Sequence, residues 1–164
     1  MPGWTNLDAD PRIPAQIHAL VPPIPLEDGS LDEVYLGHCL EHLLPEDGLE
    51  LLRECRRCLI PGGKIAVLVP DTHEIMRRYL AGDETCVEYP RGVFHPVADL
   101  DAVCRLFLYS TVQPSHHLWS YDRETLARAM TAAGFRELQE IDRFLDPRIA
   151  CGAWYQIGLE GVRP

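Results

Sequence analysis

The sequence predicts a single α/β domain with a mostly parallel sheet, and three consecutive segments support this prediction. Residues 31–37 form a short apolar run that ends in glycine, and residues 45–59 carry apolar side chains at helical spacing. Residues 65–69 then read Ile-Ala-Val-Leu-Val, apolar at every position. A strand of this kind is buried on both faces, which is typical of the interior of a parallel sheet. Strand, helix and strand together predict a right-handed βαβ unit.

The turn after the predicted helix is Pro61-Gly62-Gly63. Proline cannot extend a helix, and glycine accepts the positive φ that often ends one. In open α/β sheets, ligands bind beyond the carboxyl ends of the strands. In this chain those ends are Gly37-His38 and residues 70–73, so we expect any chemistry there.

The rest of the chain predicts further strands and helices around this unit. Short strands are expected at 4–8 and 15–20, helices at 74–80, 98–109 and 122–133, and two final strands at 135–142 and 150–159, joined by a hairpin at 145–148. One strand near the end of the sheet is expected to be antiparallel. Residues 83–119 are predicted to be a lid-like insertion within a single domain of residues 1–164.

Three stretches of the sequence also resemble a known family. DGSLDEVYLGHCLEHL, followed by LLRECRRCLIPGGKIAVLVPD, is similar to the middle of class I S-adenosylmethionine-dependent methyltransferases, and SYDRETLARAMTAAGF is similar to their late helix. The resemblance extends over residues 3–135 and implies a Rossmann-like methyltransferase fold. It further implies methyl transfer from S-adenosylmethionine to a small molecule or a glycan.

The resemblance also assigns roles to individual residues. Asp8 and Gly37 would bind the cofactor, Asp8 through the ribose hydroxyls, and His38, Asp71 and His73 would line the acceptor side. The catalytic residues expected on this basis are His38, Asp71 and His73.

The sequence departs from the family's pattern near its beginning. Only residues 1–3 precede the strand at 4–8, so the sheet is expected to lack the usual first strand with its glycine-rich turn, and no Gly-x-Gly occurs elsewhere. No acid follows the strand at 15–20 to meet the adenine amine. Two lost contacts would weaken S-adenosylmethionine binding by roughly 30-fold to 10⁴-fold. In place of the missing strand, residues 4–8 are expected to pair directly with 31–37, or a second copy of the chain in a homodimer or another partner chain is expected to supply the edge strand.

Histidines predict an alternative function that involves a metal ion. His38-Cys39-Leu40-Glu41-His42 fits the pattern H-x-x-E-H, in which two imidazoles could face one divalent metal. Similar Glu-His-Leu strings also occur in the resembled family, where no metal is implied. His38, His42, His116 and His117 are the expected ligands if the fold has lost the cofactor and uses a metal for lytic or hydrolytic chemistry. A third possibility is a catalytically silent subunit that supports a complete methyltransferase.

Composition restricts the partners and the cellular location. The net charge of −10 does not favour a nucleic-acid partner, and no apolar run reaches the roughly 20 residues of a membrane span. The first ten residues do not resemble a signal peptide, so six cysteines predict reduced thiols in the cytoplasm. Cys55 and Cys58 are expected to be buried in the core, whereas Arg53, Arg56 and Arg57 are expected on a solvated helix face.

Overall fold

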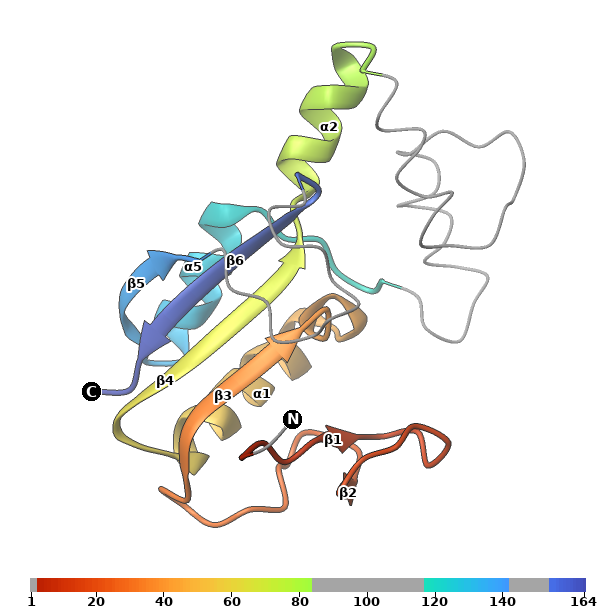
Figure 1. The fold of residues 1–164 in the computed structure, drawn as a ribbon. Coiled ribbons are helices and arrows are strands. Elements are labelled where there is room, and N and C mark those ends of the chain that lie inside the picture. Colours follow the sequence, from red (N-terminus) through yellow and green to blue (C-terminus); the bar gives the residue numbers. More distant parts are fainter. Residues whose placement is uncertain (1–2, 84–116, 142–153) are drawn as a thin grey trace.

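The computed structural model describes residues 3–83, 117–141 and 154–164, which form two sheets and the helices beside them (Figure 1). The larger sheet has the strand order β3-β4-β6-β5 and contains β3 (Leu31–Gly37), β4 (Leu59–Pro70), β5 (Arg136–Glu140) and β6 (Gln156–Val162). The smaller sheet pairs β1 (Leu7–Asp8) with β2 (Ile17–His18). The helices are η1 (Leu40–His42), α1 (Pro45–Cys58), α2 (Thr72–Leu80) and α5 (Arg123–Ala132).

The predicted βαβ unit is confirmed by β3, α1 and β4. The two strands pair in parallel, with Val34 opposite Ile65 and Leu36 opposite Val67. β6 lies between β4 and β5 and is antiparallel to both, which confirms the expected antiparallel strand near the end of the sheet. The chain therefore has the predicted α/β fold, and the carboxyl ends of β3 and β4 lie side by side.

The first two strands are shorter than the sequence predicts. Residues 4–8 and 15–20 were expected to form strands, but only two residues of each are paired, and the two strands pair in parallel with one another. The direct pairing of residues 4–8 with 31–37 was wrong, since β3 pairs only with β4 among the described strands. Addition of a strand from a partner chain to the other edge of β3 stays a prediction.

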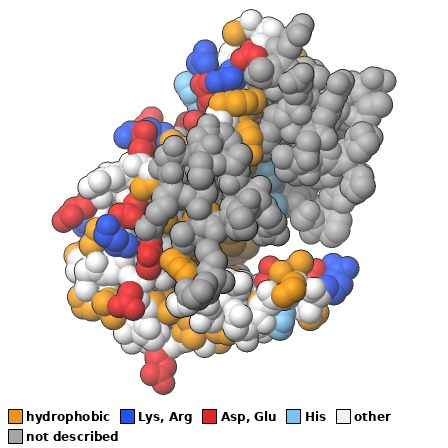
Figure 2. Space-filling model, viewed as in Figure 1, with side chains coloured by type: hydrophobic (Ala, Val, Ile, Leu, Met, Phe, Trp, Pro, Cys, Tyr) orange, Lys and Arg blue, Asp and Glu red, His pale blue; other side chains and the backbone are white. Residues whose placement is uncertain are grey.

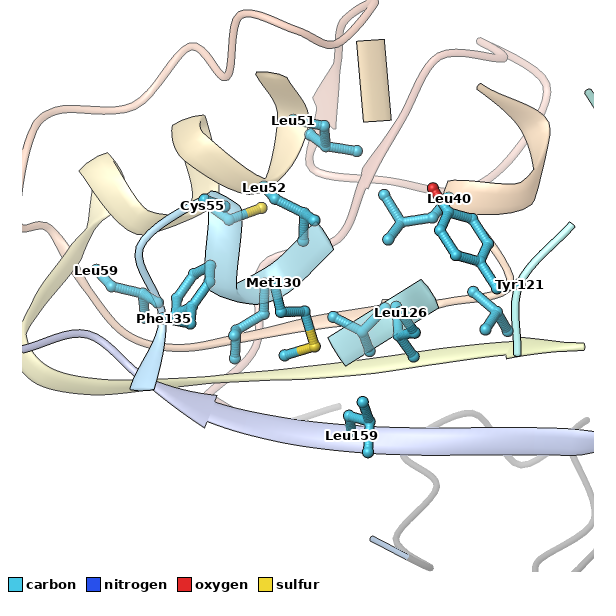
Figure 3. Packing of buried hydrophobic residues seen from close by; sticks show 14 residues of the cluster. Leu40, Leu51, Leu52, Cys55, Leu59, Tyr121, Leu126, Met130, Phe135 and Leu159 are labelled. Carbon is cyan, nitrogen blue, oxygen red and sulfur yellow. The ribbon is translucent and has the colours of Figure 1, made fainter. Parts of the chain in front are cut away.

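The hydrophobic core of the described residues lies between the larger sheet and the helices α1 and α5 (Figure 3). β4 is buried from Ile65 to Pro70, as its continuous apolar sequence predicts. Ile65, Val67 and Val69 belong to the core cluster, and the alternation of a strand directs Ala66 and Leu68 to the opposite face. Cys55 and Cys58 are free thiols with no exposed surface, so their predicted role as small core residues is confirmed.

The turn between α1 and β4 depends on two glycines for different reasons. Gly62 has a φ of +79°, as predicted for a helix end, although β4 is assigned from Leu59 onward. A Cβ on Gly63 would lie 2.9 Å from the carbonyl oxygen of Ile60 and 3.0 Å from that of Asp32. Since both neighbours are backbone atoms, a side chain at residue 63 would displace the start of β4.

Helix α1 is also fixed to the segment that precedes β3. The guanidinium of Arg57 donates to the carbonyl oxygens of Ile24 and Leu26 at 2.9 Å and pairs with Glu54 and Asp28. Arg57 was expected on a solvated face, but it is half-buried and holds residues 24–28 against the helix. On the face shown in Figure 2, the described Lys and Arg side chains are scattered among Asp and Glu.

Several predictions concern residues outside the described ranges. Most of the lid-like segment 83–119, the helix at 98–109 and the hairpin at 145–148 belong to this group. The final strand was predicted at 150–159, whereas the described strand β6 covers Gln156–Val162. Of the helices described, none has the length and hydropathy needed to span a bilayer.

Asp122 caps the N-terminus of α5 in a capping box with Thr125. Its Oδ1 accepts hydrogen bonds from the backbone nitrogen and the hydroxyl of Thr125, both at 2.7 Å, and the Asp122 nitrogen donates to that hydroxyl. These donors hold the pKa of the Asp122 carboxyl below its usual value, mainly through the Thr125 hydroxyl. The charged form is therefore favoured in the folded protein.

Replacement of Asp122 by asparagine should lower stability in a manner that depends on pH. Because folding lowers the pKa, the charged cap contributes stability above the unfolded pKa of about 3.9 and loses it as the pH falls through the folded pKa. Urea unfolding should show Asp122→Asn to be less stable by about 0.3–1 kcal/mol near neutral pH. The difference should vanish in acid; a difference independent of pH would contradict this assignment.

Candidate functional site

His38 follows β3 directly and adopts an uncommon backbone conformation. Its φ is +51°, a left-handed value that residues other than glycine rarely adopt, and its backbone nitrogen donates to the oxygen of Leu68 at 3.0 Å. Such a conformation persists only where surrounding contacts stabilise it, and it occurs often at functional sites. The predicted site at the carboxyl end of β3 therefore contains the kind of backbone geometry that active sites show.

Both ring nitrogens of His38 contact side-chain oxygens. Nδ1 lies 3.0 Å from Oε1 of Glu41, and Nε2 lies 3.0 Å from Oε1 of Gln156. A doubly protonated ring donates to both oxygens, whereas a neutral ring satisfies both contacts only if the Gln156 amide is turned to offer its nitrogen. In either case the ring is fixed between η1 and β6.

Glu41 is the buried charged residue of this site, with only 1% of its surface exposed. Its Oε1 contacts His38, while Oε2 has no hydrogen-bond donor among the described residues. Its backbone oxygen accepts hydrogen bonds from the nitrogens of Leu118 (2.7 Å) and Trp119 (3.1 Å). The chain segment that begins at His117 is therefore attached directly to η1.

This attachment brings His117 next to His42. Their ring centroids are 4.9 Å apart, with the rings nearly perpendicular. Glu41, His42 and His117 each offer a potential metal-ligand atom, and all three atoms lie within 4.8 Å of one another. Burial lowers the pKa of His117, a change that Glu41 partly opposes.

The histidines that were expected to bind one metal ion are therefore not all brought together in the structure. His42 and His117 lie together with Glu41, while His38 contacts Glu41 through Nδ1 and does not belong to this cluster. His116 lies outside the described residues.

Asp8, the expected ribose ligand, lies at the end of β1 and is half-buried. Its Oδ1 accepts a hydrogen bond from the Asp10 nitrogen at 2.8 Å. Burial raises the pKa of the Cys39 thiol to about 11, with smaller contributions from the carboxylates of Glu41 and Asp8.

Gly37 packs closely against the ring of Tyr35 at the end of β3. A Cβ at this position would lie 2.7 Å from Cε1 and 2.9 Å from the hydroxyl of Tyr35. The glycine thus makes room for the Tyr35 ring, a reason that is independent of any cofactor.

Asp71 and His73 line a cavity at the carboxyl end of β4. Oδ1 of Asp71 accepts a hydrogen bond from the Glu74 nitrogen at 3.1 Å and so caps α2, while His73 is exposed in the first turn of that helix. The cavity has a volume of about 390 Å³ and is lined by Asp71, His73, Asp122, Arg123, Glu124, Glu140 and Ile157. His73 thus lines this cavity and is not one of the three grouped residues Glu41, His42 and His117.

Two of the residues that build the site were not expected there from the sequence. Glu41 lies inside the H-x-x-E-H string, where only the two histidines were expected to bind a metal. Its position between them is the sequence feature that could have indicated that Glu41 also belongs to the site. Gln156 is 118 residues from His38 in the sequence, and no local pattern indicates the contact between them.

Comparison with known sequence families gives a match over the first part of the chain, which includes β3 and α1. Residues 6–67 match a sequence family described as a methyltransferase domain. No curated protein sequence matches the chain.

Solved structures with a similar fold include several methyltransferases. The S-adenosylmethionine-dependent methyltransferase SibL in its apo form is 21% identical with a TM-score of 0.56; 90% of this chain aligns with 35% of SibL. A possible exported protein from Bordetella parapertussis is 15% identical, with a TM-score of 0.55 and coverages of 90% and 44%. PigF, solved with SAH, is 17% identical, with a TM-score of 0.50 and coverages of 85% and 32%. This chain thus spans less than half the length of each of these proteins.

Proposed function

We propose that this chain binds S-adenosylmethionine and transfers a methyl group to a small molecule or a glycan, because residues 6–67 match a methyltransferase domain and the fold is similar to that of an S-adenosylmethionine-dependent methyltransferase. The observation that carries this proposal is the position of Asp8. Asp8 is the last residue of β1, and its carboxylate contributes a small part of the raised pKa of Cys39, which lies two residues after β3. In open α/β folds, nucleotide cofactors bind beyond the carboxyl ends of the strands.

The Asp8 carboxylate fits a sugar diol. One of its oxygens holds the turn through the Asp10 nitrogen, and a carboxylate has a second oxygen and further lone pairs with which to accept from hydroxyl groups. PigF was solved with SAH, the demethylated form of the proposed cofactor. The match to the methyltransferase domain covers both Asp8 and the end of β3.

The acceptor would bind beyond the carboxyl end of β4, in the cavity beside His73. The cavity beside His73 has a volume within the roughly 300–1,000 Å³ range of small-molecule sites, and most of its lining side chains are charged. Such a lining suits an acceptor rich in hydroxyl or amino groups, as a glycan is. Because Asp71 caps α2, its role in this proposal is to position His73.

Bound S-adenosylmethionine would supply an electrophilic methyl group. The chain's own contribution is to hold the acceptor oxygen or nitrogen in line with that group and to accept its proton. His73 is exposed beside the cavity and can take a proton at a ring nitrogen, whereas the nitrogens of His38 contact Glu41 and Gln156. We therefore assign proton acceptance to His73 and positioning of the β3 end to His38.

The proposal is tested by calorimetry with S-adenosylmethionine on the whole chain and on Asp8→Asn. Loss of one charged partner for the ribose should weaken binding by about 1–3 kcal/mol, which is roughly 5-fold to 150-fold. Asp32→Asn is the matched control, because Asp32 is an exposed acid at the start of β3 and should leave the affinity unchanged.

Two results would contradict the proposal. The first is failure of the unmodified chain to bind S-adenosylmethionine at millimolar concentration. The second is equal affinity of Asp8→Asn and the unmodified chain, which would mean that the cofactor binds elsewhere.

A further inference from the structure

We propose that Glu41, His42 and His117 form a mononuclear site for a divalent transition-metal ion such as zinc. The three ligand atoms lie within 4.8 Å of one another and come from η1 and the segment attached to it. The proposal is independent of methyl transfer, since neither Asp8 nor the cavity beside His73 takes part in it.

The distances are compatible with coordination after small side-chain rotations. Zinc binds imidazole nitrogen and carboxylate oxygen at about 2.0–2.2 Å, so two ligands of one ion lie about 3.4 Å apart in a tetrahedral site. Atoms that are at most 4.8 Å apart therefore need to approach by at most about 1.4 Å. The two backbone hydrogen bonds to the Glu41 oxygen already fix the opposing segments in place.

An independent observation at Glu41 points to a cation. This carboxylate is 1% exposed, and its Oε2 has no donor within the described part of the chain. A buried carboxylate oxygen without a partner is costly, and a metal ion would satisfy it. Nδ1 of His38 contacts the other carboxylate oxygen, Oε1. In metal sites, residues outside the coordination shell commonly orient a ligand through such a hydrogen bond.

The donor set determines the kind of ion. Two imidazoles and one carboxylate suit zinc and other first-row transition metals, whereas magnesium prefers an octahedron of oxygen atoms. Three protein ligands leave at least one position for water or for a substrate oxygen. The site would thus resemble catalytic rather than structural zinc sites in its coordination.

The experiment uses untagged chain purified in a chelator and titrated with zinc by calorimetry. We expect one zinc per chain with micromolar or tighter affinity, weakened at least about 100-fold in His42→Ala and in His117→Ala. Glu41→Gln keeps the shape of the buried side chain and provides a third variant if an alanine variant does not fold. His18→Ala is the matched control, because His18 is an exposed histidine on β2.

Cobalt substitution distinguishes this site from a thiolate site that involves Cys39. Cobalt in the proposed site should show ligand-field bands without the charge-transfer band of a thiolate ligand. Absence of zinc binding, unchanged affinity in the His42→Ala/His117→Ala double variant, or a thiolate band would each overturn the proposal.

Discussion

Replacement of Phe135 by alanine should lower the free energy of unfolding by about 3–5 kcal/mol. Phe135 has no exposed surface and follows α5, where its nitrogen donates to the oxygen of Met130. Figure 3 shows its ring among Leu59, Cys55 and Met130, between α1 and the sheet. The substitution removes a large buried ring from the core, where α1 and α5 pack against the larger sheet.

Urea unfolding followed by circular dichroism measures this effect. Phe135→Leu retains most of the buried volume and should cost less than about 1.5 kcal/mol. Leu20→Ala serves as the surface control, because Leu20 is 83% exposed and its truncation should change stability by no more than about 0.5 kcal/mol. A cost for Phe135→Ala as small as that of Leu20→Ala would contradict the position of this ring in the core.

The central unit of the fold could be predicted because its signals are local. A glycine ends β3, a helical period defines α1, and an uninterrupted apolar run defines the part of β4 that is buried on both faces. The early start of β4 at Leu59 could not be predicted, since it depends on pairing with Leu31 across the sheet. The short strands β1 and β2 carry only two paired residues each, too few for a periodic pattern to define their bounds.

The candidate site was predictable only in part, for a similar reason. The carboxyl ends of β3 and β4 follow from topology, and the H-x-x-E-H string places Glu41 and His42 near one another. The contact between His117 and His42 depends on backbone hydrogen bonds from Leu118 and Trp119 to Glu41, which join segments far apart in the sequence. The cavity beside His73 likewise joins segments far apart in the sequence, since Asp122, Glu140 and Ile157 also line it.

The second large effect on stability is expected at the candidate site, from the pair formed by His38 and Glu41. Glu41 is 1% exposed and the His38 side chain 23% exposed, and Nδ1 and Oε1 lie 3.0 Å apart. No other described donor reaches either carboxylate oxygen of Glu41. Removal of one partner from a buried pair leaves the other uncompensated, so His38→Ala should cost about 3–5 kcal/mol.

A double-mutant cycle separates this pairing from simple loss of the ring. In a Glu41→Gln background the buried charge is absent, so His38→Ala should cost only about 1 kcal/mol, as for an ordinary hydrogen bond. All four proteins are unfolded in urea with a chelator present, because a bound ion would stabilise the folded state of the chains that retain Glu41. An equal cost of His38→Ala in both backgrounds would show that the imidazole packs beside Glu41 without compensating its charge. A coupling of about 2 kcal/mol or more would instead identify His38 as the residue that permits a buried carboxylate at the end of β3.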